Sequence, residues 1–155
     1  MDTSHGFVSS VLWAQATRVK KSVAINAPVE AVWDALTNPE KTKRYFYNCG
    51  VFSDWKAGSP IVFKGKMLLV IPVELEGVIM EVKPNKLLKY KLFNESDDRG
   101  GSSTITDELD YVDGETLVHI TDDVGLGNGA EDRYKRSVKG WDKVLKGLKD
   151  FVEHN

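Results

Sequence analysis

The segment STITDELDYVDGETLVHITDD, residues Ser103–Asp123, predicts a β-hairpin. Apolar and polar residues alternate on both sides of Asp113-Gly114, and an Asp-Gly pair between such runs is a strong signal for a two-residue turn. That turn sets Val112 opposite Glu115 and thereby fixes the register of every other pair. The side of the hairpin that carries the apolar residues then consists of Ile105, Asp107, Leu109, Tyr111, Thr116, Val118, Ile120 and Asp122.

Two aspartates on this apolar side need an explanation. In the predicted register Asp107 faces Ile120 and Asp122 faces Ile105, so the aspartates are diagonal neighbours with Cβ atoms roughly 7 Å apart. Two isolated buried ions would be very costly, so at least one must be paired, solvated or protonated. Either this end of the hairpin lies at a rim that water reaches, or the aspartates are polar anchors in an apolar pocket and orient the hydroxyl or amine of a ligand.

The rest of the sequence predicts further strands and three helices. Val19–Ile25 has the pattern of a strand, and NAPVEAVWDAL predicts a helix with Asn26 as its N-cap. Pro39 can open a second short helix over Glu40–Phe46, and Asn128 can cap a long amphipathic helix over Glu131–Glu153. The other strands are expected at Val51–Asp54, Ile61–Lys66, Val73–Lys83, Leu87–Phe93, Ser103–Val112 and Glu115–Val124.

The order of these elements predicts an α+β fold. A sheet with one apolar face needs a cover, and the last helix has the longest apolar stripe. We therefore expect a helix-grip fold, in which a curved antiparallel sheet of six or seven strands wraps around a long C-terminal helix and two short helices follow the first strand. We expect one domain over residues 17–155 and an N-terminal extension over residues 1–16.

Composition and motifs exclude several classes of protein. The formal net charge of −2 gives no general attraction to nucleic acid or anionic lipid. Cys49 is the only cysteine and the histidines are scattered, so no disulfide, metal site, Cys-His pair or Ser-His-Asp triad can be argued. The N-terminal residues lack the pattern of a signal peptide, and no stretch has the length of a membrane span. We expect a cytoplasmic monomer or homodimer without a cofactor.

Five stretches carry a family resemblance: INAPVEAVWDALTNPEKTKRYF, DWKAGSPIVF, GVIMEVKPNKLLKY, STITDELDYVDGETLVHIT and GWDKVLKGLKDFVE. In this order they resemble the activator-of-heat-shock-ATPase-like branch of the START-like, Bet v 1-like superfamily, from about Val19 to Glu153. The resemblance implies a helix-grip fold with a deep apolar cavity between the sheet and the long helix. It implies no single function, because the superfamily includes lipid carriers, hormone receptors, cyclases, hydrolases and co-chaperones.

Three functions are compatible with these features. The leading interpretation is a protein that binds a small hydrophobic or amphipathic, lipid-like ligand in the cavity. The alternatives are an activator of a heat-shock-protein ATPase with a chaperone partner, and a cyclase- or hydrolase-type enzyme in which Asp107 or Asp122 acts with Tyr90 as acid and base. The candidate ligand-binding residues are Tyr45, Phe63, Met80, Tyr90, Leu92, Ile105, Asp107, Leu109, Val118, Ile120, Asp122, Tyr134, Val138, Gly140 and Trp141.

Two glycines bear on whether the cavity is empty. Gly140 and Gly147 lie beside the apolar stripe of the last helix, where each costs roughly 1 kcal/mol relative to alanine. Either they allow close packing against a short helix or strand, or they leave space for a ligand. The ligand interpretation requires a closed cavity of roughly several hundred Å³ between Gly140 and the Asp107 strand. An interior filled by side chains would contradict it.

Overall fold

The structure is a computed structural model that describes residues 17–67, 71–93 and 102–154. The expected N-terminal extension, residues 1–16, and most of the turn expected after Phe93 lie outside these residues. The elements in chain order are β1 (Arg18–Ile25), α2 (Val29–Thr37), α3 (Pro39–Thr42), β2 (Gly50–Ser53), β3 (Pro60–Met67), β4 (Ile71–Lys83), β5 (Leu87–Phe93), β6 (Ser102–Val112), β7 (Glu115–Asp123) and α4 (Ala130–Glu153).

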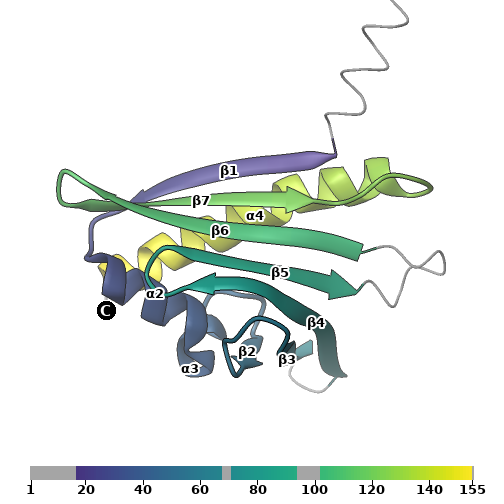
Figure 1. Cartoon of the computed structure of the whole chain (residues 1–155), viewed down its shortest axis with the longest axis horizontal. Helices are drawn as coiled ribbons and strands as arrows, with labels where there is room; N and C mark the ends of the chain where they lie inside the picture. Colours follow the sequence, from purple (N-terminus) through teal and green to yellow (C-terminus); the bar gives the residue numbers. More distant parts are fainter. Residues whose placement is uncertain (1–16, 68–70, 94–101, 155) are drawn as a thin grey trace, which may run out of the picture.

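The predicted helix-grip architecture is confirmed. Seven strands form one antiparallel sheet in the order β1-β7-β6-β5-β4-β3-β2, and the sheet curves around α4 (Figure 1). The two short helices α2 and α3 lie together at one end of the sheet, and α2 also contacts α4. No described helix is long and apolar enough to cross a membrane.

The hairpin between β6 and β7 has the predicted register. Val112 pairs with Glu115, and the turn residues Asp113 and Gly114 both have positive φ, 52° and 83°, as a type I′ turn requires. Asp107 lies opposite Ile120 and Asp122 opposite Ile105. The local turn thus places both aspartates on the face of the sheet that is turned toward α4.

Three predictions about helix ends are wrong. Helix α2 begins at Val29 with Pro28 at its N-cap, and the backbone N–H of Asn26 instead donates to Glu153 Oε2 at 2.8 Å. Helix α4 has Gly129, in a left-handed conformation, at its N-cap instead of Asn128.

The second short helix is also shorter than expected. It ends at Thr42, whose Oγ1 accepts the Val51 N–H at 2.9 Å, and the chain then turns toward α4. Backbone hydrogen bonds from the Tyr45 and Phe46 N–H groups to the Thr42 carbonyl oxygen continue as turns over the rest of the expected helix.

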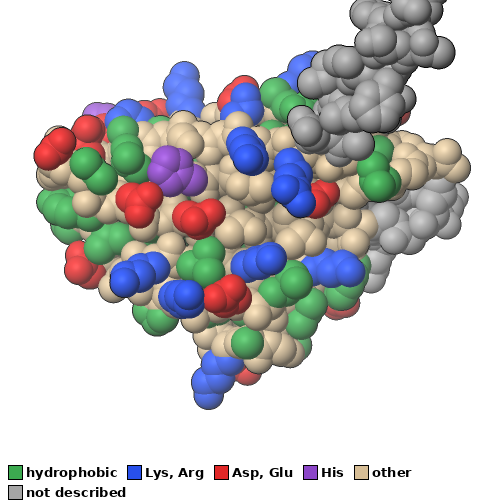
Figure 2. Space-filling model, turned by 45° about the horizontal axis from the view of Figure 1, so that its top comes forward, with side chains coloured by type: hydrophobic (Ala, Val, Ile, Leu, Met, Phe, Trp, Pro, Cys, Tyr) green, Lys and Arg blue, Asp and Glu red, His purple; other side chains and the backbone are tan. Residues whose placement is uncertain are grey.

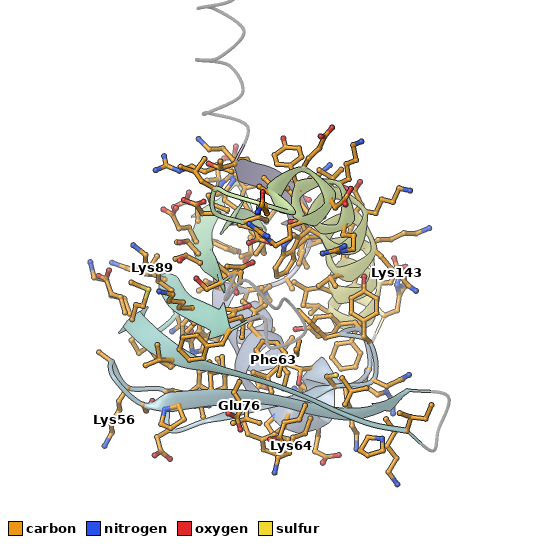
Figure 3. All side chains as sticks on the ribbon, turned by 90° about the vertical axis from the view of Figure 1, so that its right-hand side faces the viewer. Lys56, Phe63, Lys64, Glu76, Lys89 and Lys143 are labelled. Atoms are coloured by element: carbon orange, nitrogen blue, oxygen red, sulfur yellow. The ribbon has the colours of Figure 1, made fainter. Side chains whose placement is uncertain are left out.

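The core lies between the concave face of the sheet and α4. Figure 3 shows Phe63 directed into this space, whereas Lys64, Glu76 and Lys89 point away from it. Helix α4 contributes the buried side chains of Trp141, Val144, Leu145 and Leu148.

On the face of the molecule seen in Figure 2, acidic and basic side chains are interspersed.

The C-terminal part of α4 is fastened to β1. Lys149 Nζ donates to the carbonyl oxygen of Ala24 at 2.6 Å and lies 2.7 Å from Glu153 Oε2. Because Glu153 also accepts the Asn26 N–H, the last turns of α4 bind both the end of β1 and the residue after it. These contacts fix the position of the helix across the sheet.

Candidate functional site

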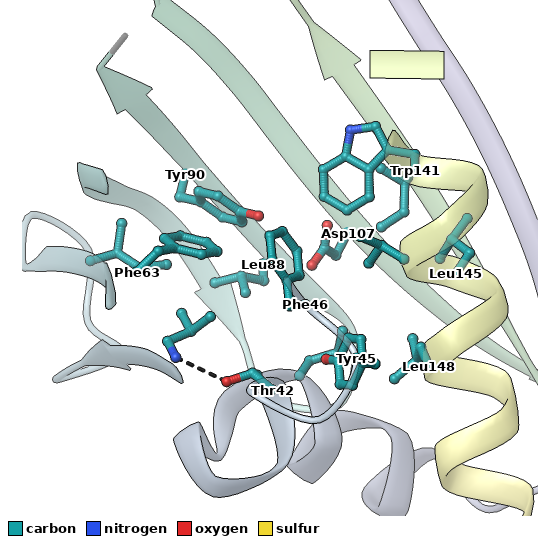
Figure 4. A pocket seen from close by; sticks show the side chains of 15 residues that line it. Thr42, Tyr45, Phe46, Phe63, Leu88, Tyr90, Asp107, Trp141, Leu145 and Leu148 are labelled. Carbon is teal, nitrogen blue, oxygen red and sulfur yellow. Dashed lines mark hydrogen bonds between the residues drawn. The ribbon is translucent and has the colours of Figure 1, made fainter. Parts of the chain in front are cut away.

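A pocket lies between α4, the inner face of the sheet and the chain that follows α3 (Figure 4). Six of the fifteen candidate residues line it: Tyr45, Phe63, Tyr90, Asp107, Ile120 and Trp141. Apolar and aromatic side chains make up most of the wall, and Asp107 is the one acidic residue among the described residues that form it. The pocket therefore combines an apolar environment with a single ionisable carboxyl group.

Asp107 is buried in this environment. Its side chain belongs to β6 and only 4% of the residue is exposed, so the interpretation of a solvated rim is wrong. Its Oδ1 atom has no hydrogen-bond partner among the described residues. Burial raises the pKa of Asp107 to about 7, and the negative charge of Asp122 contributes to the same shift. Asp107 can therefore gain or lose a proton near neutral pH.

Asp122 is also buried, with 6% of the residue exposed, but it has partners on α4. Ser137 Oγ donates to Asp122 Oδ2 at 2.7 Å, and Trp141 Nε1 donates to the same oxygen at 2.9 Å. Burial raises the pKa of Asp122, whereas these two hydrogen bonds lower it. Its Oδ1 has no partner among the described residues. Asp122 thus serves to fasten α4 to β7, and Asp107 has no comparable role.

Two tyrosines accompany Asp107. Figure 4 shows the hydroxyl group of Tyr90 directed toward the Asp107 carboxyl group. The hydroxyl of Tyr45 donates to the carbonyl oxygen of Ala35 at 2.6 Å. Burial, together with the negative charge of Asp107, raises the pKa of both tyrosines, so both keep their protons at neutral pH. Tyr90 can therefore act as a hydrogen-bond donor beside the carboxyl group.

The pocket is almost filled by side chains. It encloses a cavity of about 20 Å³, and a cavity of roughly 10–15 Å³ by the same measure holds one water molecule. The expected void of several hundred Å³ is therefore absent, and the interpretation of a cavity that is already open for a ligand is wrong. Phe46 lies in this space, with its ring centroid 5.2 Å from that of Phe63 and 5.8 Å from that of Trp141.

The chain after α3, residues 43–49, closes the pocket against α4. A Cβ at Gly147 would lie 3.0 Å from Cβ of Tyr45, and a Cβ at Gly140 would lie 3.2 Å from the hydroxyl of Tyr47. Both glycines therefore permit close packing, which was one of the two interpretations of their spacing. They do not border an empty volume.

The other candidate residues lie outside the pocket wall. Ile105, Leu109 and Val118 are buried in the surrounding core with Asp122, and Leu92, Tyr134, Val138 and Gly140 are partly buried. Met80 was placed on the wrong side of the sheet. A register shift between Ile79 and Glu81 leaves Met80 unpaired, and 46% of the residue is exposed.

Sequence reasoning missed nine residues of the pocket wall: Leu36, Thr42, Phe46, Val51, Ile61, Leu88, Val144, Leu145 and Leu148. Strand alternation could have found two of them, because Leu88 is in phase with Tyr90 and Ile61 with Phe63. The helical spacing of Leu145 and Leu148 pointed to the core but not to the pocket. Thr42 gave no signal, because a threonine in a short polar helix is usually exposed.

The structure also brings Ser22, His119 and Asp110 together, whereas no Ser-His-Asp arrangement was expected from their positions in the chain. Ser22 Oγ lies 2.7 Å from His119 Nδ1, and Asp110 Oδ2 lies 3.6 Å from His119 Nε2. The three side chains lie on the solvent-facing side of the sheet, and none of them lines the described pocket. We assign them no catalytic role.

The fold and pocket define this protein as a START-like helix-grip domain. The chain belongs to the family described as Activator of Hsp90 ATPase homolog 1-like protein, whose model matches residues 26–153. No curated protein matches the chain.

Solved structures have the same fold. A protein from Cytophaga hutchinsonii is 34% identical, with a TM-score of 0.68 over 88% of this chain and 94% of that one. A protein from Mesorhizobium loti is 19% identical, with a TM-score of 0.76 over 89% of this chain and 98% of that one. The Aha1 dimer from Colwellia psychrerythraea is 20% identical, with a TM-score of 0.70 over 88% of this chain and 96% of that one.

Proposed function

We propose that the protein binds a small hydrophobic or amphipathic molecule between the sheet and α4, with Asp107 as its polar anchor. The observation that carries this proposal is a buried carboxyl group, with one oxygen that lacks a partner, on the wall of an apolar pocket. Such a group destabilises a core that could hold an apolar residue instead. A polar contact to a molecule from outside the chain would offset that cost.

Binding requires the pocket to enlarge, because ligand pockets usually measure about 300–1,000 Å³. The wall formed by residues 43–49 is the part that we expect to move. Tyr47 and Asn48 have φ values of 51° and 60°, and left-handed backbone at a residue such as Tyr47 costs on the order of 1–3 kcal/mol. Tyr47 is held to α4 by a long hydrogen bond of 3.4 Å to the Gly140 carbonyl oxygen. Movement of this segment would withdraw Phe46 from the space beside Asp107.

The proposal is tested with the uncharged fluorescent dye Nile red and with native mass spectrometry of the purified chain. The Phe46→Ala variant should bind the dye more tightly than the wild type does, because it removes the ring that fills the pocket. An open groove of about 370 Å³ on the outer face, lined in part by Phe52 and Trp55, could also take up the dye. Phe52→Ala is therefore the matched control and should leave binding unchanged.

Two results would contradict the proposal. One is that neither the wild type nor Phe46→Ala binds the dye and the native mass is that of the bare chain. The other is that binding is lost in Phe52→Ala and unaffected by Phe46→Ala, which would place the dye in the outer groove.

Family membership favours a second candidate function, stimulation of a heat-shock-chaperone ATPase. The measurement is the ATP turnover of the host's own chaperone of this class with and without the purified chain. Unchanged turnover at saturating concentrations of the chain would exclude this function. Light scattering of the same sample would distinguish a monomer from a homodimer such as the one described for the Colwellia protein.

A further inference from the structure

We infer that the molecule bound beside Asp107 carries a positive charge, as an amine or quaternary ammonium group attached to an apolar body. This inference rests on the proposed binding function and narrows it to one class of ligand. Its basis is the arrangement of charges and aromatic rings around a cavity that is already large enough for a group the size of a water molecule.

The pocket contains an ionisable carboxyl group, and the described residues of its wall supply no counter-ion for it. None of the residues that the structure places on its wall is basic, and Asp107 lies on that wall with Asp122 as its diagonal neighbour in the sheet. Arg133 is the buried basic residue of the described chain, and its guanidinium group donates to the carbonyl oxygens of Val124, Leu126 and Asn128. Both causes of the shift in the pKa of Asp107, burial and Asp122, act in the upward direction. A ligand cation would supply the attraction that the pocket lacks.

Aromatic rings on the same wall favour a cation as well. Phe63, Tyr90 and Trp141 lie on this wall, and the centroids of the Phe63 and Tyr90 rings are 5.9 Å apart. Figure 4 shows Tyr90 and Trp141 beside the Asp107 carboxyl group, and neither ring belongs to the segment that is expected to move. The face of an aromatic ring attracts a cation electrostatically, and the attraction is stronger in a desolvated site.

Other polar groups fit this environment less well. A carboxylate or phosphate would place a further negative charge beside two buried acids, which raises the cost of binding. A hydroxyl group could hydrogen-bond to Asp107 but would leave its charge without compensation. Amines are therefore expected to bind more tightly than alcohols with the same apolar body, and alcohols more tightly than acids.

The experiment compares octylamine, octanol and octanoate by calorimetric titration at about pH 8, where Asp107, with its pKa of about 7, is mostly ionised. We expect octylamine to bind about ten-fold or more tightly than octanol, and octanoate to bind most weakly. In Asp107→Asn the preference for the amine over the alcohol should disappear while octanol binding persists. Asp110→Asn is the matched control, because Asp110 lies on the same strand but is exposed. It should keep the preference.

The outcomes separate this inference from the function on which it rests. If octanol or octanoate binds as tightly as octylamine, the cationic ligand class is wrong and the binding function stands. If the preference for the amine survives in Asp107→Asn but is lost in Asp110→Asn, the amine binds at the surface beside Asp110. That result would also overturn the inference. If none of the three compounds binds to the wild type or to Phe46→Ala, both the binding function and the inference fail.

Discussion

Replacing Asp107 with asparagine should abolish a large part of the dependence of stability on pH. In the folded protein the pKa of Asp107 is raised from 3.8 to about 7, first by burial and then by the charge of Asp122. Between about pH 4 and pH 7 the folded chain therefore keeps a proton that the unfolded chain has lost. The free energy of unfolding must fall as the pH rises through this range, and Asp107 should cause no further change above it.

The size of this effect follows from the shift in the pKa. A difference of about 3 pKa units corresponds to on the order of 4 kcal/mol. That is a large share of the roughly 5–15 kcal/mol that stabilises a typical domain. Asparagine has nearly the same shape as a protonated aspartate and never ionises. We expect Asp107→Asn to match the wild type near pH 4 and to be more stable by a few kcal/mol at pH 8.

Urea denaturation followed by circular dichroism at several pH values between about 4 and 8.5 measures this difference. Subtracting the variant from the wild type at each pH removes the contributions of acids that do not interact with Asp107, such as Glu153, whose pKa is lowered by the hydrogen bond from the Asn26 N–H. Asp110→Asn controls for the loss of a carboxylate from the same strand and should follow the wild type. A difference that stays constant with pH, or a variant that is less stable than the wild type at pH 8, would refute the reasoning.

Three further changes test the packing around the pocket. Thr42→Val leaves the buried Val51 N–H without its acceptor and should lower the free energy of unfolding, measured by urea denaturation, by about 1–3 kcal/mol. Thr42→Ser keeps the acceptor and should cost little, so equal losses in the two variants would contradict the assigned hydrogen bond. Phe63→Ala, which removes a buried ring, should cost about 3–5 kcal/mol, and a loss below that range would mean that the site is not packed as described. Gly77→Ala places a Cβ 2.0 Å from the Lys91 carbonyl oxygen, so hydrogen exchange should reveal loss of amide protection between β4 and β5; unchanged protection would contradict their register.

Local signals account for the parts of the fold that the sequence predicts well. The Asp113-Gly114 turn needs positive φ at both residues, and the period of two then determines which side chains of β6 and β7 face inward. In the same way, apolar residues at helical spacing place α4 within one residue of its observed start. Each of these features depends on residues that are close together in the chain.

The features that the sequence did not predict depend on distant residues. The end of α3 is held by a hydrogen bond from the Val51 N–H of β2 to Thr42 Oγ1, and the orientation of Met80 depends on a bulge against β5. The volume of the pocket depends on how Phe46 fits between β3 and α4. Periodicity identifies the face of an element that is buried, but it does not report how much space remains between two buried faces.

The attachment of α4 to β1 has a consequence for self-assembly. The outer edge of a sheet presents free N–H and C=O groups to which a strand from another molecule can add. Lys149 binds the carbonyl oxygen of Ala24, and Glu153 binds the N–H of Asn26. The last turns of the helix therefore block the addition of another strand at this end of β1. The strand at the opposite edge of the sheet, β2, has only four residues and offers another strand a length of only about 13 Å for pairing. Deletion of the last two helical turns, which removes both Lys149 and Glu153, should therefore expose these groups at the end of β1 and promote aggregation through that edge.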